Sequence, residues 1–245
     1  MTWLALSPLF FVVAFLYSSV GHGGASGYLA LMALFLSIPS SQMSTTALIL
    51  NLLVAGASFF FYWRSGHFSG RLTWPFTVAS VPAALVGGML SVEPRVYSGL
   101  LAVVLFLAAL RLILALPAGG GGTRQLRLPL AIAAGGGIGL VSGIIGIGGG
   151  IFLSPLLILA RWADPKRTSA TSALFIVANS ASGLLGRAAG GTFAMGPLWP
   201  IMGATLTGGL LGSYLGSGPF SGPLLRRLLG VVLLLAAAKL AQGIL

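Results

Sequence analysis

Apolar residues dominate the chain, and only short polar or glycine-rich stretches interrupt them. Most of the apolar runs have the ~20 residues that a helix needs to cross a hydrocarbon core. The second and seventh runs have only about 12 residues, and each directly follows a glycine cluster. The pattern predicts an all-α integral membrane protein with about ten membrane segments. The ten runs are 3–20, 26–37, 44–62, 72–90, 97–116, 130–145, 151–161, 168–187, 197–216 and 224–243.

Composition supports the membrane assignment. Of the 245 residues, 57% are hydrophobic and 6% are charged, against about 25% charged in soluble domains. A soluble enzyme of this length could not cover its surface with so few charges. The net charge of +11 would ordinarily suggest nucleic-acid binding, but the basic residues are scattered between apolar runs. We therefore expect membrane lipids as partners and no nucleic acid, and we interpret the charge as a record of orientation.

The two halves of the chain repeat each other at a spacing of 125 residues. Their shared order predicts a first repeat at 1–116, a linker at 117–129 and a second repeat at 130–245, together forming one membrane domain. Because a short segment follows a glycine cluster in each half, each repeat is expected to contain a glycine-broken, partly re-entrant hairpin. The matched pairs include Gly21 and Gly146, Gly23 and Gly148, Gly24 and Gly149, Gly66 and Gly191, and Gly87 and Gly212.

The basic residues choose between two topologies. If each glycine cluster starts a new segment, each half has five segments and the second half is inverted. One face then carries Arg64, Arg71, Arg111, Arg124, Arg127, Arg161, Lys166, Arg167, Arg226 and Arg227. The opposite face carries three bases, Arg95, Arg187 and Lys239. If the clusters are merely kinks, the faces carry seven and six bases. The five-plus-five reading obeys the positive-inside rule and places both termini outside the cytoplasm.

The glycine clusters are the first candidate site. Glycine lets the backbone turn sharply and lets a ligand come close, and the helix that follows begins with unpaired N–H groups and the positive end of its dipole. Two such helix starts that face each other would bind an anion. The alternative is a pair of tight hairpins that only serve packing. The candidate residues are Gly21, Gly23, Gly24, Ser26, Gly146, Gly148, Gly149 and Gly150.

Two polar patches form the second candidate site. Uncharged hydroxyl and amide donors suit a desolvated oxyanion, because they bind it without holding it too tightly. Helix capping and interhelical hydrogen bonding are the alternative roles for such residues. The candidates are Thr45, Thr46 and Asn51 in the first half and Thr171, Ser172 and Asn179 in the second.

Three charged or titratable features refine the picture. His22 lies inside the first glycine cluster, where it could donate a hydrogen bond, carry a proton or face interfacial water. Arg187 ends the eighth segment, either as a snorkelling anchor or as a residue that attracts anions at an entrance. Glu93 and Asp164 fall in loops, so a proton relay built on buried carboxylates is not expected.

Gly24-Ala25-Ser26-Gly27 matches a short serine-nucleophile motif, which chance explains better because a nucleophilic serine also needs a base.

The glycine clusters and the Ser44–Leu48 and Ala170–Leu174 patches resemble those of the sulfite exporter TauE/SafE family, also called the 4-toluene sulfonate uptake permease family. The segment 143–150 is the most specific part, together with Pro155, Asp164-Pro165 and Ala170-Thr171-Ser172. The resemblance covers nearly the whole chain. It implies transport of sulfur-containing oxyanions, such as sulfite and organosulfonates, across the bacterial inner membrane. His22 and Thr45-Thr46 depart from the usual pattern of the first half.

The working hypothesis is therefore a transporter, not an enzyme, with no catalytic residue, metal or cofactor. Its two broken hairpins would meet near the midplane, bind one sulfur oxyanion and expose it to each side in turn as the repeats rock. An anion channel of the same architecture, an intramembrane serine protease and a non-transporting scaffold are the alternatives. The sequence leaves the oligomeric state open, and a homodimer is compatible with it.

Overall fold

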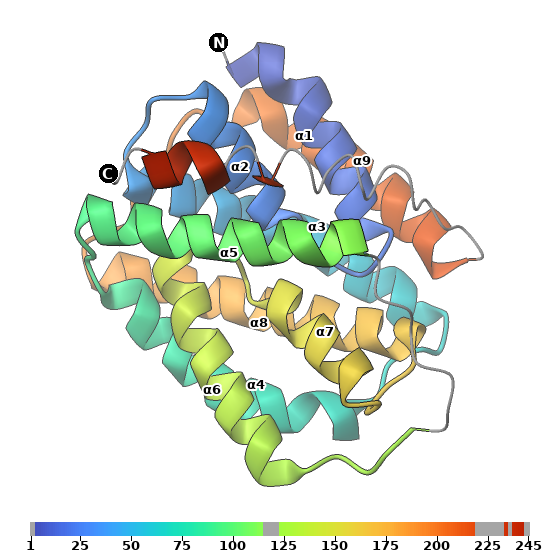
Figure 1. Cartoon of the computed structure of the whole chain (residues 1–245). Coiled ribbons are helices and arrows are strands. Elements are labelled where there is room, and N and C mark those ends of the chain that lie inside the picture. Colours follow the sequence, from blue (N-terminus) through green and yellow to red (C-terminus); the bar gives the residue numbers. More distant parts are fainter. Residues whose placement is uncertain (1–2, 115–122, 219–232, 235–236, 243–245) are drawn as a thin grey trace.

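A computed structural model describes residues 3–114, 123–218, 233–234 and 237–242. Within these ranges the chain forms the nine α-helices labelled in Figure 1 and no β-strand. The helices are α1 (Trp3–Ser18), α2 (Ala25–Phe35), α3 (Ser40–Arg64), α4 (Gly70–Met89), α5 (Pro94–Leu114), α6 (Leu128–Ile145), α7 (Gly150–Leu159), α8 (Pro165–Ala189) and α9 (Trp199–Ser217).

These helices coincide with the first nine predicted segments, and the prediction of an all-helical chain is confirmed for the described residues. The two segments expected to be short are the two short helices, with 11 residues in α2 and 10 in α7. Most of the tenth predicted segment, 224–243, lies outside the described residues, although 233–234 and 237–242 are helical. The repeat boundaries stay a prediction, because much of the linker also lies outside them.

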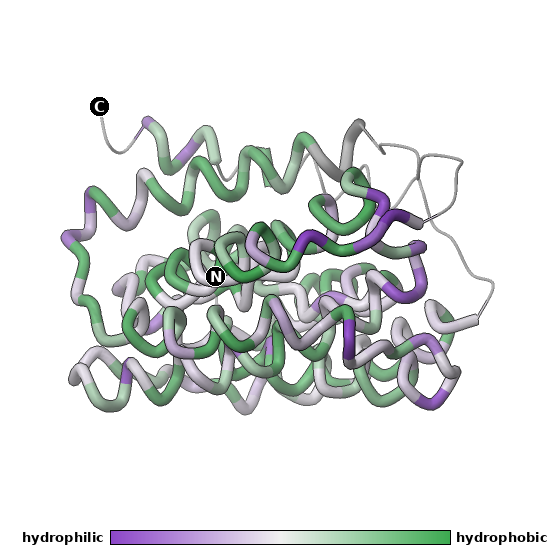
Figure 2. The backbone as a smooth tube through the Cα atoms, turned by 90° about the horizontal axis from the view of Figure 1, so that it is seen from below, coloured by the Kyte–Doolittle hydropathy of each residue, from purple (hydrophilic) through white to green (hydrophobic). Residues whose placement is uncertain are grey.

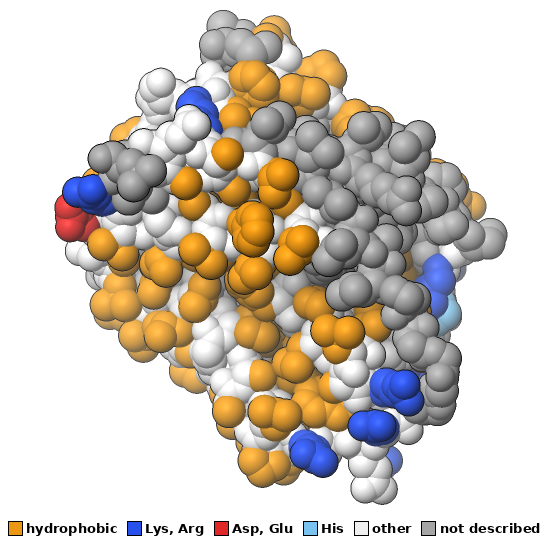
Figure 3. All heavy atoms as spheres, in the orientation of Figure 1, with side chains coloured by type: hydrophobic (Ala, Val, Ile, Leu, Met, Phe, Trp, Pro, Cys, Tyr) orange, Lys and Arg blue, Asp and Glu red, His pale blue; other side chains and the backbone are white. Residues whose placement is uncertain are grey.

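The helices have the composition of membrane segments. Four of those described, α3, α4, α6 and α8, are long and apolar enough to cross a membrane. Hydrophobic residues run along the helices, while the most hydrophilic ones gather at helix ends and connections (Figure 2). Hydrophobic side chains also cover the middle of the face in Figure 3, with Lys and Arg toward its margins. These features identify a multi-pass membrane protein.

Neither acidic residue lies within a described helix. Glu93 immediately precedes α5. Asp164 is the N-cap of α8, where its Oδ1 accepts hydrogen bonds from the backbone N–H groups of Lys166 at 3.0 Å and Arg167 at 2.9 Å. This capping bond and the proline that follows at the first helical position define where α8 begins.

The most extensive helix contacts join the two halves of the chain. α1 packs along α9, and α4 packs along α6, so each pair combines one helix from each half. In Figure 1, α1 and α9 lie together at the upper right, and α4 and α6 lie at the bottom. α9 also packs on α3, and α4 on α8. We call α1, α2, α3 and α9 the first body, and α4, α6, α7 and α8 the second body.

Each body combines helices from both halves of the chain. Each contains three consecutive helices of one half plus the fourth helix of the other, and they meet where α3 contacts α8. Rocking of the repeats, the motion hypothesised from the sequence, stays a prediction. A motion that separated the two halves as intact units would break the α1–α9 and α4–α6 contacts.

Two helix contacts are related by the 125-residue spacing. A Cβ at Gly87 would overlap the carbonyl oxygen of Leu140, and one at Gly212 would overlap that of Phe15. Gly212 lies 125 positions after Gly87, and Leu140 lies 125 positions after Phe15. The predicted internal repeat thus corresponds to matching helix contacts.

Glycine permits these close contacts. On α6, a Cβ added at any of three positions spaced by four residues would overlap a carbonyl oxygen of α4. Small residues with this spacing let helix backbones approach in a bilayer, where apolar side chains alone give little driving force for association. The three glycines are Gly135, Gly139 and Gly143, and the facing residues of α4 are Phe76, Ser80 and Ala84.

We expect Gly139→Val to separate α4 from α6 and to lower the free energy of unfolding by about 1–3 kcal/mol, the usual cost of overpacking. Gly137→Val is the matched control, because Gly137 lies on the same helix with nothing within 4 Å of its added Cβ. Thermal unfolding in detergent micelles, followed by circular dichroism, measures both. Equal stability of the two variants would contradict the proposed role of this contact.

Candidate functional site

The two glycine clusters form the turns that lead into the short helices. The first turn joins the end of α1 at Ser18 to the start of α2 at Ala25, and the second joins Ile145 to Gly150. The N-cap residues, Gly24 and Gly149, have φ angles of 93° and 80°. Residues other than glycine rarely adopt this left-handed backbone conformation. The prediction that each cluster ends one helix and begins another is confirmed.

Each turn packs on a central helix of the opposite body. A Cβ at Gly21 would overlap the backbone of Ser169 on α8, and one at Gly146 would lie 2.8 Å from Cα of Ser44 on α3. These two contacts are also related by 125 residues. Ser169 Oγ additionally donates a hydrogen bond of 2.9 Å to the carbonyl of Val20. The turns therefore lie where the two bodies meet.

Asn51 of α3 connects both turns. Its Oδ1 accepts a 3.2 Å hydrogen bond from the backbone N–H of Ala25, the first residue of α2. Its Nδ2 donates to the carbonyl of Ile147 in the second turn at 3.1 Å. A Cβ at Gly23 would overlap Asn51 Oδ1, and one at Gly148 would overlap Nδ2. One buried amide thus satisfies a helix start on one side and a turn carbonyl on the other.

His22 also connects the two bodies. Its Nδ1 lies 2.9 Å from the carbonyl of Val20, and its Nε2 lies 3.1 Å from the carbonyl of Gly150 and 3.0 Å from Ser154 Oγ. Carbonyl oxygens only accept hydrogen bonds, so a doubly protonated ring can donate to both carbonyls. A neutral ring protonated on Nδ1 can instead accept from Ser154. The surroundings provide partners for either protonation state.

A hydroxyl pair continues the network from His22. Ser154 Oγ of α7 lies 2.7 Å from Ser172 Oγ of α8. Both side chains are buried. The predicted site residues thus form two neighbouring groups. Asn51 contacts Gly23 and Gly148, while His22, Gly150 and Ser172 are linked through Ser154.

Other predicted residues have local partners. Thr45 Oγ1 donates to the carbonyl of Ser41 at 2.8 Å, as expected for a helix hydroxyl bonded one turn back. Thr171 Oγ1 accepts from Thr73 Oγ1 at 3.2 Å. Thr46 Oγ1 is buried and has no hydrogen-bond partner among the described residues. Leaving such a hydroxyl unsatisfied costs about 1–3 kcal/mol.

Ser26 does not have the surroundings of a nucleophile. Its Oγ lies 2.6 Å from the hydroxyl of Tyr17, whereas the Nε2 of His22 faces Ser154 and Gly150. The hydroxyl of tyrosine is a poor general base near neutral pH, because its ordinary pKa is about 10. The serine-protease alternative gains no support from this geometry.

The second half has no equivalent of Asn51 at the turns. The sequence pattern paired Asn51 with Asn179, but Asn179 Nδ2 donates to Phe175 in its own helix at 3.0 Å. The residue 125 positions after Asn51 is Ile176, and Ile176 lies against Gly148 and Gly150. Ser180, one helical turn beyond Ile176, lies 3.4 Å from Asn51 Nδ2 and was not predicted. The i, i+4 spacing from Ile176 could have identified it.

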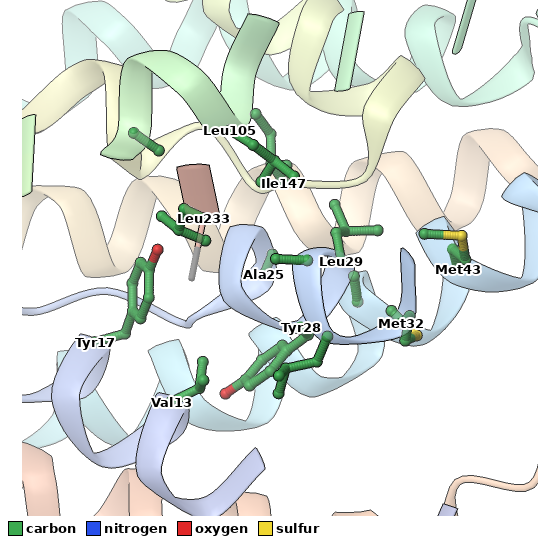
Figure 4. Close-up of a cluster of buried hydrophobic side chains, with 14 of the residues drawn as sticks. Val13, Tyr17, Ala25, Tyr28, Leu29, Met32, Met43, Leu105, Ile147 and Leu233 are labelled. Atoms are coloured by element: carbon green, nitrogen blue, oxygen red, sulfur yellow. The ribbon is translucent and has the colours of Figure 1, made fainter. Parts of the chain in front are cut away.

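A hydrophobic cluster anchors the second turn. Ile147 stands where the first turn has His22, and it is buried with Leu105 of α5 and with Ala25 and Leu29 of α2 (Figure 4). This packing holds the turn carbonyl that Asn51 binds. The second turn is therefore held by apolar packing as well as by the bond to Asn51.

We expect Asn51→Ala to lower the free energy of unfolding by about 2–4 kcal/mol, because it leaves the Ala25 N–H and the Ile147 carbonyl buried without a partner. Asn179→Ala is the matched control, since it removes a bond within one helix and should cost about 1 kcal/mol or less. Thermal unfolding in detergent would measure both. A smaller loss for Asn51→Ala than for Asn179→Ala would contradict the bridging role.

Comparison with known proteins identifies the family of the chain. The family model described as sulfite exporter TauE/SafE matches residues 6–240. A protein of Sinorhizobium fredii (strain NBRC 101917 / NGR234), described as probable membrane transporter protein y4hK, is 34% identical over 249 residues, which cover 97% of each chain. No solved structure matches. The extent of both matches shows that the chain belongs to the sulfite exporter TauE/SafE family of membrane transporters.

Proposed function

We propose that the protein carries small sulfur-containing oxyanions, such as sulfite or organosulfonates, across the bacterial inner membrane by alternating access. The observation that carries the proposal is the position of the two glycine turns, which meet around Asn51 at the contact between the two bodies. A ligand bound there would contact both bodies, so its affinity could change as they move.

The available donors favour an anion. The first turns of α2 and α7 carry the positive ends of two helix dipoles toward this region. The polar side chains around the turns are the amide of Asn51, the imidazole of His22 and the hydroxyls of Ser154 and Ser172. None of these is a carboxylate, and such a set can bind an oxyanion and still release it. Thr46 would gain a partner if the substrate reached α3.

Motion between the bodies is the natural way to open the site. His22 and Asn51 belong to the first body, and their partners Gly150, Ser154 and Ile147 belong to the second. A small rotation would exchange these bonds for bonds to the substrate. The glycine contacts within each body are backbone contacts and would persist.

The proposal includes ten segments in two inverted repeats, with both termini on the periplasmic side. The ten-against-three distribution of basic residues supports this orientation. The matching contacts at a spacing of 125 residues support the repeat. A duplicated unit that faces opposite ways offers the substrate two related half-sites, one for each side of the membrane.

Flux into proteoliposomes tests the proposal. Wild-type protein should give saturable uptake of sulfite or a sulfonate, accelerated by unlabelled substrate on the other side. Gly148→Ala should lose most of this flux, because its Cβ would overlap Asn51. Gly191→Ala is the matched control: Gly191 has a similar φ of 68°, but nothing lies within 4 Å of its added Cβ.

Three results would count against the proposal. Flux without saturation or trans-stimulation would indicate a channel. Absence of flux for every sulfur oxyanion in the panel would remove the substrate assignment. Gel filtration would first show that both variants are folded. Equal flux for Gly148→Ala and Gly191→Ala would then contradict the assignment of the glycine turns to the transport site.

His22 gives a prediction about pH. Protonation of the ring would place a positive charge at the turns, so a pH dependence that arises from His22 should raise uptake as the pH falls. His22→Gln keeps a hydrogen-bond donor but cannot titrate, and its flux should be nearly independent of pH. Methanesulfonate is the suitable substrate because it stays ionised throughout. A parallel pH dependence in both proteins would contradict the role of His22.

A further inference from the structure

A polar pocket lies beside the second glycine turn. It is a cavity of about 90 Å³ between the start of α3, the connection from α4 to α5 and the end of α8. Hydroxyl groups supply much of its polar lining. The lining residues are Ser40, Ser41, Ser44, Leu90, Ser91, Val92, Tyr97, Ile144, Arg187 and Thr192.

Arg187 is the charged residue of this lining, and it is buried, with 4% of its surface exposed. Its Nη2 donates to the carbonyls of Gly143 at 2.9 Å and Ile144 at 2.7 Å, in the last turn of α6. Its Nε is buried with no hydrogen-bond partner in the described part of the chain. The guanidinium thus has donor capacity that the carbonyls do not use.

Arg187 also has no counter-ion among the described residues. The one salt bridge found there joins Arg167 to Asp164. Glu93, the acid nearest to the pocket in sequence, is exposed and makes no salt bridge in the described structure. A buried cation without an anionic partner lowers the stability of the folded protein. The charge of Arg187 therefore calls for a functional explanation.

The first half of the chain makes the same kind of contact without a charge, so the positive charge of Arg187 is not needed to bind the carbonyls at the end of α6. The residue 125 positions before Arg187 is Tyr62, and its hydroxyl donates to the carbonyl of Ser19 at 2.9 Å. Ser19 is the counterpart of Ile144, which Arg187 binds. A neutral hydroxyl therefore makes the equivalent contact in the first half, and the positive charge of Arg187 needs a separate explanation.

We propose that this pocket binds a small inorganic oxyanion, of the size of sulfite, through the guanidinium of Arg187 and the surrounding hydroxyls. The role of the pocket in transport, as a loading site next to the glycine turns, rests on the proposed function. Two contacts connect the pocket to the second turn. Ser44 packs on Gly146, and the Tyr97 hydroxyl, which accepts from Ser44 at 2.9 Å, donates to the carbonyl of Ile145 at 3.2 Å.

The volume of the pocket predicts its selectivity. Cavities that hold a benzene ring measure about 150 Å³, well above the roughly 90 Å³ found here. A three- or four-oxygen anion fits within this volume, whereas an aromatic sulfonate would have to extend beyond it. The pocket should therefore favour sulfite and sulfate over benzenesulfonate, even if the transport site accepts all three.

The central experiment replaces Arg187 by the residue of the other half. Arg187→Tyr should keep a cap on α6 and the melting temperature while removing the charge. The loss of hydrogen bonds to a charged group should weaken sulfite binding, and raise KM for sulfite uptake, by about 10- to 100-fold. The maximal rate should change little. Calorimetric titration of the detergent-solubilised protein with sulfite and with benzenesulfonate measures binding, and proteoliposome uptake gives KM.

Two further variants keep the test decisive if Arg187→Tyr does not fold. Ser91→Asp changes an exposed lining residue and adds a negative charge to the pocket without touching Arg187, so it should also raise KM for sulfite. Arg95→Gln is the control, because it removes an exposed cation near the start of α5 and outside the pocket lining. It should leave KM and sulfite binding unchanged.

The outcomes separate this proposal from the transport proposal. Sulfite uptake with the same KM in wild type and in every folded variant at Arg187 or Ser91 would overturn the pocket and leave the transport function standing. Sulfite binding that is lost in Arg187→Tyr or Ser91→Asp but kept in Arg95→Gln would support the pocket, even if no sulfur oxyanion were transported. Benzenesulfonate binding as tight as sulfite binding, and equally sensitive to the variants, would overturn the proposed selectivity.

Discussion

Direct contact between helix backbones is the constraint on which the rest of this structure depends. In a bilayer, apolar side chains gain little by leaving lipid for another helix, so association relies on close packing and on hydrogen bonds. The glycines of α6 bring its backbone against the carbonyls of α4, and those of α9 do the same against α1. Because these contacts leave no room for a side chain, they fix which helices stay together in each body.

The exchange of α4 and α9 between the repeats follows from these contacts and determines where the site lies. If each repeat packed on itself, its glycine turn would be surrounded by its own helices. Instead, each turn reaches the central helix of the opposite body, Gly21 at Ser169 and Gly146 at Ser44. A single amide on α3 can then bond to both turns. The site is consequently an interface, and its geometry depends on the relative position of the two bodies.

The sequence predicts the elements of this fold better than their arrangement. Segment lengths, glycine turns and the 125-residue repeat can be read from local composition and spacing, because each reflects a requirement of the backbone itself. Which helices pack together depends on the faces they present, and the spacing carries no information about that. For the same reason the amide of Asn179 seemed equivalent to that of Asn51, although the contacts show that Ile176 occupies the equivalent position. Arg187 was identified as a charge at a helix end, but the pocket around it depends on residues from three separate segments.

The duplicated halves agree where backbones touch and differ where side chains could do chemistry. Glycine recurs at both turns and at both helix contacts. At other positions the residues differ: at the spacing of 125 residues, His22 corresponds to Ile147, Asn51 to Ile176 and Tyr62 to Arg187. Identical residues in both halves would give two equivalent faces and a site with no preferred direction of approach. The observed differences place the titratable ring and the bridging amide in the first half and the buried cation in the second. On our proposal, an oxyanion that entered past Arg187 would leave a cationic pocket for a site lined by neutral donors and one imidazole, so the side chains that differ between the halves would give it two chemically distinct surroundings.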